Sequence, residues 1–174
     1  MNTQTKKLTL SGFFLALALL LPFVTMQIPQ LGSALLPMHL PVLLCGFVCG
    51  GPAGALVGFA SPLLRNLLFG MPPLFPTGIA MAAELCCYGF LAGFVYDKLK
   101  KTSTSILPSL LIAMLGGRAV WGIVSVALYR AAGTPFGWQL FFAGAFLNAL
   151  PGILVQLILI PLLVLALKKT KLSL

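Results

Sequence analysis

Three charged residues lie inside long apolar stretches, where a charge is hardest to accommodate. They are Arg65, Glu84 and Arg118. A charged side chain near the centre of a bilayer costs about 2.5–3.5 kcal/mol on insertion scales, so such residues normally face a partner or a water-filled cavity. One carboxylate neutralises one guanidinium, and here two arginines accompany one glutamate. The guanidinium that is left over suits an anionic ligand, because it can fork two hydrogen bonds onto a carboxylate.

Further polar and aromatic side chains lie in the same stretches, and the order of the expected helices places the charges at a similar depth. Glu84 can pair with either arginine simply to hold helices together, and Arg65 can instead reach the outer interface. His39 can serve as a hydrogen bonder at a helix end, and Asn148 as a contact between helices. The convergence of these polar side chains in the outer half of the membrane predicts a cavity that opens outward. The candidate substrate-binding residues are Arg118, Arg65, Glu84, His39, Asn148 and Trp121.

The sequence offers no arrangement of residues for catalysis. Ser61, Ser125 and His39 have no motif around them, and no nucleotide-binding Walker A sequence is present. We therefore expect no enzymatic activity. Four cysteines lie within apolar segments without a histidine or acidic residue beside them, which favours small buried hydrophobic side chains over a metal site or a cofactor. These cysteines are Cys45, Cys49, Cys86 and Cys87.

Composition places the chain in a membrane. Of the 174 residues, 60% are hydrophobic and 7% are charged, whereas soluble domains carry about 25% charged residues. The net charge of +9 could indicate nucleic-acid binding. The lysines, however, form three short clusters, at 6–7, 98–101 and 168–171, and each cluster flanks an apolar run. That pattern is typical of membrane anchors, so we expect no nucleic-acid partner.

Apolar runs of sufficient length predict an all-α membrane protein with six transmembrane helices in one bundle. A span needs about 20 apolar residues, and glycine- and proline-rich breaks separate the runs. Residues 1–174 then form a single domain. The second run is short and contains Pro37 and Pro41, which favours a broken or partly re-entrant segment. The predicted spans are 8–28, 37–50, 52–70, 77–97, 105–130 and 139–167.

The lysine clusters select one orientation for these six spans. With the N-terminus inside, the 97–104 loop and the C-terminus also lie inside, and all eight lysines become cytoplasmic, as the positive-inside rule requires. The first run lacks a clear small-residue cleavage site, so we interpret it as a retained helix and not as a signal peptide.

Four segments resemble the substrate-binding S components of energy-coupling factor (ECF) vitamin transporters. They are residues 36–47 (LPMHLPVLLCGF), 58–76 (GFASPLLRNLLFGMPPLFP), 116–122 (GGRAVWG) and 144–152 (GAFLNALPG). The resemblance covers nearly the whole chain. It implies a multi-pass protein of a prokaryotic plasma membrane that binds a vitamin tightly from outside. It also implies docking on a membrane scaffold subunit, the T component, with two ATPase subunits that hydrolyse ATP.

The same resemblance suggests a docking surface and a substrate. S components commonly dock through small residues on the first helix, and here Gly12, Ala16 and Ala18 have that character. The sequence looks closest to the branch linked with pantothenate, so we expect pantothenate or another small carboxylated vitamin or precursor. The alternative function is a stand-alone channel or secondary carrier for a small organic anion. Such a carrier usually shows an internal repeat, and none is evident in the sequence.

Overall fold

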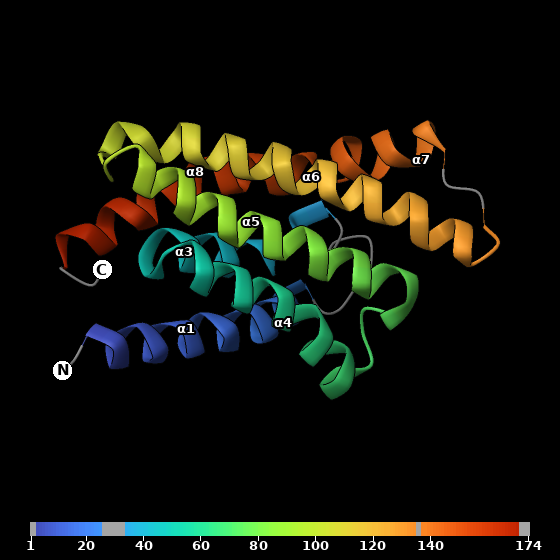
Figure 1. Ribbon diagram of the computed structural model, residues 1–174, viewed down its shortest axis with the longest axis horizontal. Coiled ribbons are helices and arrows are strands. Elements are labelled where there is room, and N and C mark those ends of the chain that lie inside the picture. Colours follow the sequence, from blue (N-terminus) through green and yellow to red (C-terminus); the bar gives the residue numbers. More distant parts are fainter. Residues whose placement is uncertain (1–2, 26–33, 135–136, 171–174) are drawn as a thin grey trace.

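The computed structural model describes residues 3–25, 34–134 and 137–170, and the regular structure within these ranges is entirely helical. This confirms the predicted all-α class (Figure 1). The helices are α1 (Thr3–Leu20), α3 (His39–Cys49), α4 (Gly51–Phe69), α5 (Ile79–Lys98), α6 (Ile106–Ala131), α7 (Trp138–Phe142) and α8 (Leu150–Lys169), with short turns of tighter or wider helix at η1 (Leu21–Thr25), η2 (Leu74–Gly78), η3 (Ser103–Ser105) and η4 (Ala143–Leu147).

Four helical segments in the described part of the chain are long and apolar enough to cross a membrane. Helix α3 is not one of them, because its 11 residues rise only about 16 Å against a hydrocarbon core of about 30 Å. Helix α4 has 19 residues but includes Arg65 and Asn66, and it is not among the four either. The predicted count of six spans is therefore not confirmed. The four segments are Thr3–Phe23, Leu74–Lys98, Ser103–Ala131 and Leu150–Lys169.

Helix α3 is the centre of the molecule. All of its residues except Leu40 are buried, and it packs against α1, α4, α5 and α8. A helix that is apolar on every side must be surrounded either by protein or by lipid. Here protein surrounds it, which explains why a segment too short to cross the bilayer has the composition of a span.

Helices α4 and α5 touch through their backbones. A Cβ atom on Gly89 would lie 2.2 Å from the carbonyl oxygen of Gly54, and one on Gly58 would lie 2.2 Å from the carbonyl oxygen of Leu85. Only glycine permits such an approach, as is common where membrane helices pack. The contact fixes the rotation of α5 and turns Glu84, the neighbour of Leu85, into the interior, where it is 2% exposed.

The lysine-rich segments meet at one end of the bundle. Helix α1 begins and helix α8 ends at the same end as the connection between α5 and α6 (Figure 1). At this end the Lys168 ammonium donates a hydrogen bond to the carbonyl oxygen of Lys101 and lies 5.1 Å from the centre of the Tyr96 ring. The second and third lysine clusters are thus brought together.

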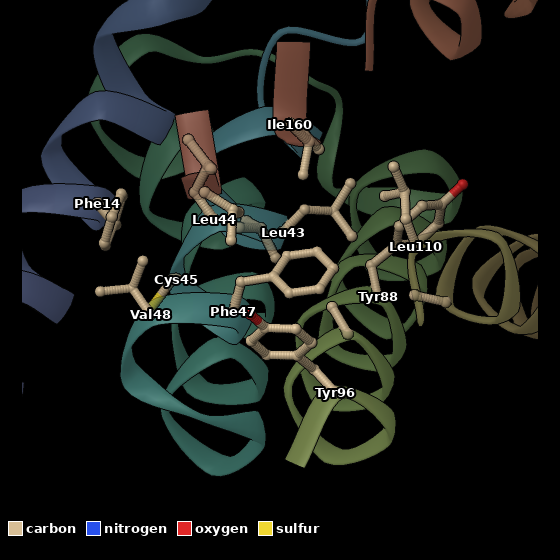
Figure 2. Packing of buried hydrophobic residues seen from close by; sticks show 14 of the residues in the cluster. Phe14, Leu43, Leu44, Cys45, Phe47, Val48, Tyr88, Tyr96, Leu110 and Ile160 are labelled. Carbon is tan, nitrogen blue, oxygen red and sulfur yellow. The ribbon is translucent and has the colours of Figure 1, made fainter. Parts of the chain in front are cut away.

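An apolar core fills the space between this end and the buried charges. Figure 2 shows side chains from α1, α3, α5, α6 and α8 meeting there. The Phe47 and Tyr96 rings pack edge to face with their centres 5.1 Å apart. Leu43 and Ile160 belong to the same buried cluster. The core joins α3 to the helices that surround it. It thereby sets the positions of the buried polar side chains next to the core.

Candidate functional site

Arg118, Glu84 and His39 form one buried cluster contributed by three helices. The Arg118 Nη1 atom of α6 lies 2.9 Å from Glu84 Oε1 of α5, and His39 Nε2, at the start of α3, lies 3.5 Å from the same oxygen. All three side chains are almost fully buried. Of the two pairings left open for Glu84, the structure therefore has the one with Arg118.

Tyr88 supports this cluster from one turn further along α5. Its ring packs edge to face on the His39 ring, with the ring centres 5.1 Å apart. On the other side it lies against α6, where a Cβ atom on Gly117 would come within 2.1 Å of the Tyr88 ring. The glycine beside Arg118 thus makes room for an aromatic ring that holds His39 and α6 in position.

The cluster leaves hydrogen-bonding capacity unused. The Nε and Nη2 atoms of Arg118 and the Nδ1 atom of His39 have no hydrogen-bond partner among the described residues. Buried polar groups are normally paired with protein or ordered water, and a missing partner is costly, most of all for a charged group. Two buried guanidinium nitrogens without partners in the described ranges leave hydrogen bonds that water or a ligand can accept.

Arg65 has a different environment. Its Nη1 atom donates a hydrogen bond of 2.6 Å to the carbonyl oxygen of Leu19, near the end of α1. The guanidinium carbon lies 5.1 Å from the centre of the Phe23 ring and 5.4 Å from that of Phe69. The final carbonyls of a helix lack partners within it and favour a positive charge. Arg65, one of the two arginines considered as a ligand contact, thus ties α4 to α1 in this structure.

Asn148 and Trp121 lie in two further environments. Asn148 is exposed, in the turn between η4 and α8. The Trp121 ring stacks on the Phe141 ring, with the centres 6.1 Å apart. A Cβ atom on Gly144 would lie 2.8 Å from Trp121, so this glycine allows the indole to approach. Trp121 thus connects α6 with the segment that precedes α8.

A cavity of about 590 Å³ lies between α6 and the segment that contains α7. None of the six predicted substrate-binding residues lines it. Two of its lining residues, Ala119 and Gly122, follow Arg118 within about one turn of α6, and Arg130 is exposed about three turns away along the same helix. The cavity thus adjoins the turn that carries Arg118. Its lining residues are Ala119, Gly122, Ile123, Val126, Arg130, Gly137 and Phe141.

Comparison with protein families identifies the chain. The sequence model of the family described as "ECF transporter, substrate-specific component" matches residues 6–164. The chain belongs to this family. Comparisons with curated proteins and with solved structures found no match. An ECF substrate-specific component is a membrane subunit that takes a small-molecule substrate and works with a T component and ATPase subunits.

The residues expected to dock this ECF component on its partner differ in exposure. Gly12 and Ala16 lie exposed on α1, and a Cβ atom on Gly12 would meet nothing within 4 Å. Ala18 is fully buried, so it faces the bundle and is not presented on the surface. The part of the predicted docking surface that a partner can reach therefore consists of Gly12 and Ala16.

The cysteines of this ECF component lie in apolar surroundings. Cys45 and Cys49 are buried on α3, and Cys86 and Cys87 are half-buried on α5. The Cys45 sulfur lies 4.0 Å from the Ser11 hydroxyl oxygen of α1. Within the described ranges, no group of three or more histidine, cysteine or acidic side chains could hold a metal ion.

Sequence reasoning missed two buried polar residues of this ECF component. Gln156 of α8 and Tyr88 of α5 are fully or almost fully buried. The sequence indication for Gln156 was a single amide side chain within the apolar run 153–160. The helix that contains it has no other polar side chain before its lysines. Tyr88 directly follows two cysteines and has no local signature that separates it from a tyrosine of the apolar core.

Proposed function

We propose that this ECF component binds a small organic anion from outside the cell at the Arg118 cluster and delivers it to a T component with two ATPase subunits. The observation that carries the proposal is the buried guanidinium of Arg118, which has one nitrogen on Glu84 and two without partners among the described residues. In a family whose members bind small molecules, such a group is a natural anchor for a ligand.

The unused guanidinium donors of the cluster favour an anion over a cation. Glu84 and Arg118 neutralise each other, and a further cation would compete with the guanidinium for one carboxylate. A ligand carboxylate can accept hydrogen bonds from Arg118 Nε and Nη2 together, in the forked geometry that arginine presents. His39 Nδ1 also lacks a partner in the described part of the chain, and with Nε2 facing Glu84 it can accept a hydrogen bond from a hydroxyl or amide group of the ligand.

We infer that the substrate is pantothenate or another small carboxylated vitamin or precursor. The sequence resemblance favours pantothenate. The cavity between α6 and the segment that contains α7 is not lined by Arg118 itself but adjoins its helical turn, and its volume of about 590 Å³ is within the range of about 300–1,000 Å³ that is usual for small-molecule sites. Its apolar lining residues, such as Ile123 and Phe141, suit a ligand whose middle part is uncharged.

The proposed orientation places the lysine-rich end of the bundle in the cytoplasm of a prokaryotic cell, with six segments crossing or entering the plasma membrane. The joined lysine clusters at 98–101 and 168–169 support it, because cytoplasmic ends of membrane helices carry an excess of lysine and arginine. The substrate then enters from the opposite end, where Arg130 lies in the last turn of α6.

Mass spectrometry of the small molecule that the purified protein retains tests the proposal. We expect an organic anion at close to one equivalent per chain, with pantothenate as the first candidate. A retained cation, or a neutral molecule without an acidic group, would contradict the anion site. Uptake of the anion by proteoliposomes that contain this chain without ATPase subunits would instead support the stand-alone carrier.

A further inference from the structure

Three helices of the bundle run in the same direction, so their residues can be compared by depth. His39 of α3 packs on Tyr88 of α5, and eight residues later in both helices Phe47 packs on Tyr96. Helix α8 also runs toward the lysine-rich end (Figure 1), where its Lys168 lies over the Tyr96 ring. Because α5 and α8 meet at Tyr96 and Lys168, residues can be counted back from this contact to compare their depth in the bundle.

A residue count from the lysine-rich end places Gln156 of α8 near the level of the Arg118 cluster. From the lysine-rich end, Gln156 precedes Lys168 by twelve residues and Glu84 precedes Tyr96 by the same number. At the other end α8 lies against the segment before α3: a Cβ atom on Gly152, four residues before Gln156, would lie 2.6 Å from the carbonyl oxygen of Ala34.

Gln156 also faces inward. It is 1% exposed, and it lies on the face of α8 defined by Gly152, Ile160 and Val164, which are all buried at steps of four residues. Both its amide atoms, Nε2 and Oε1, lack hydrogen-bond partners among the described residues. A buried amide normally finds partners, and this one lies near the depth where Arg118 and His39 also have polar atoms without partners among the described residues.

We propose that a polar chamber surrounds the unpaired Arg118 nitrogens and extends across the bundle to α8, and that Gln156 hydrogen-bonds the substrate. This inference rests on the proposed function and refines it. The amide offers one donor group and one acceptor, so the substrate carries a hydroxyl or amide group some distance from the carboxylate that Arg118 holds. A simple fatty acid or another carboxylate with an apolar body leaves the amide unpaired and binds poorly.

Cysteine labelling tests whether the chamber reaches α8. Gln156→Cys and the control Ile160→Cys, one turn further along the same face, are placed in the full chain in proteoliposomes. Each is treated with the small anionic thiol reagent sulfonatoethyl methanethiosulfonate, and the unsubstituted protein supplies the background from the native cysteines. We expect Gln156→Cys to react at least ten-fold faster than Ile160→Cys. Equal rates, whether slow or fast, would overturn the proposal.

A second variant covers the case in which the cysteine protein does not fold. Gln156→Met keeps the side-chain volume and removes both hydrogen-bonding groups. If the amide lies in a dry core without partners, this change raises the Tm of the purified protein, since an unpaired buried amide is unfavourable. If the amide lies in a wet chamber, the Tm stays the same or falls, as we expect. A clear rise in Tm would overturn the inference.

The outcomes separate this inference from the function on which it rests. If the protein retains an organic anion but its Gln156→Cys variant is not labelled, the role of Gln156 is contradicted and the proposed function stands. Labelling at position 156 in a protein that retains a cation would confirm the chamber and overturn the anion site.

Discussion

The Nη1 atom of Arg118 lies 2.9 Å from Glu84 Oε1, and this pair joins α6 to α5 with both side chains almost fully buried. Glu84 is one of two acidic residues in the whole sequence. Removing one partner of a buried ion pair leaves an uncompensated charge, which is far more costly than losing a pair on the surface. The two acidic residues therefore provide a matched test.

Glu84→Gln should destabilise the protein strongly. The change leaves the Arg118 guanidinium buried without its counter-charge, at an expected cost of about 3–5 kcal/mol. The matched control is Asp97→Asn, because Asp97 pairs with Lys101 at 3.1 Å with both side chains about half exposed, which predicts a loss of about 0–1 kcal/mol. Unfolding of both variants in detergent measures the difference. Equal losses of unfolding free energy would show that the buried ion pair contributes no more to stability than the surface pair.

Arg65→Ala should weaken the fold without changing the affinity for the ligand. The variant loses the hydrogen bond to the Leu19 carbonyl oxygen and the contacts with the Phe23 and Phe69 rings. We expect a loss of about 2 kcal/mol, in the range for a hydrogen bond from a charged group. Thermal unfolding and ligand titration of the same preparation separate the two effects. A large loss of affinity with unchanged stability would place Arg65 in the binding site.

Gly89→Ala should disrupt the packing of α4 on α5. The added methyl group would lie 2.2 Å from the carbonyl oxygen of Gly54, and backbone cannot move aside as a side chain can. We expect a loss of about 1–3 kcal/mol or more, measured by unfolding in detergent. Gly12→Ala is the matched control, since a Cβ atom there meets nothing within 4 Å and alanine favours a helix. Equal effects at the two positions would contradict the close contact of the helices.

Part of the site could be predicted from the sequence. Charges are so rare in the apolar runs that Glu84 and Arg118 were candidates to form an ion pair, and the order of the helices placed them at a similar depth. The partner of Arg65 could not be predicted, because it is a backbone carbonyl on α1 and a carbonyl has no sequence signature. The exposure of Asn148 was also beyond prediction, since it depends on where η4 ends and α8 begins.

The fold shows the same division between what sequence patterns reveal and what packing decides. Helix α3 was predicted as a span because a helix surrounded by protein and a helix surrounded by lipid are both apolar on all sides. Only the length of the helix distinguishes the two cases, and that length became known when the structure showed that α3 begins at His39. Gln156 was missed for a related reason: its neighbours along the chain are apolar, and its burial depends on how α8 packs against other helices.

Ligand titration of the wild-type protein and Arg118→Ala by calorimetry tests the central claim most directly. The ligand is the anion that the purified protein retains, or pantothenate if none is retained, and Arg65→Ala serves as the control for a lost arginine elsewhere. We predict that Arg118→Ala binds about 10- to 150-fold more weakly, equivalent to about 1.5–3 kcal/mol for a hydrogen bond from a charged group, while Arg65→Ala keeps its affinity. Unchanged binding by Arg118→Ala would contradict the account.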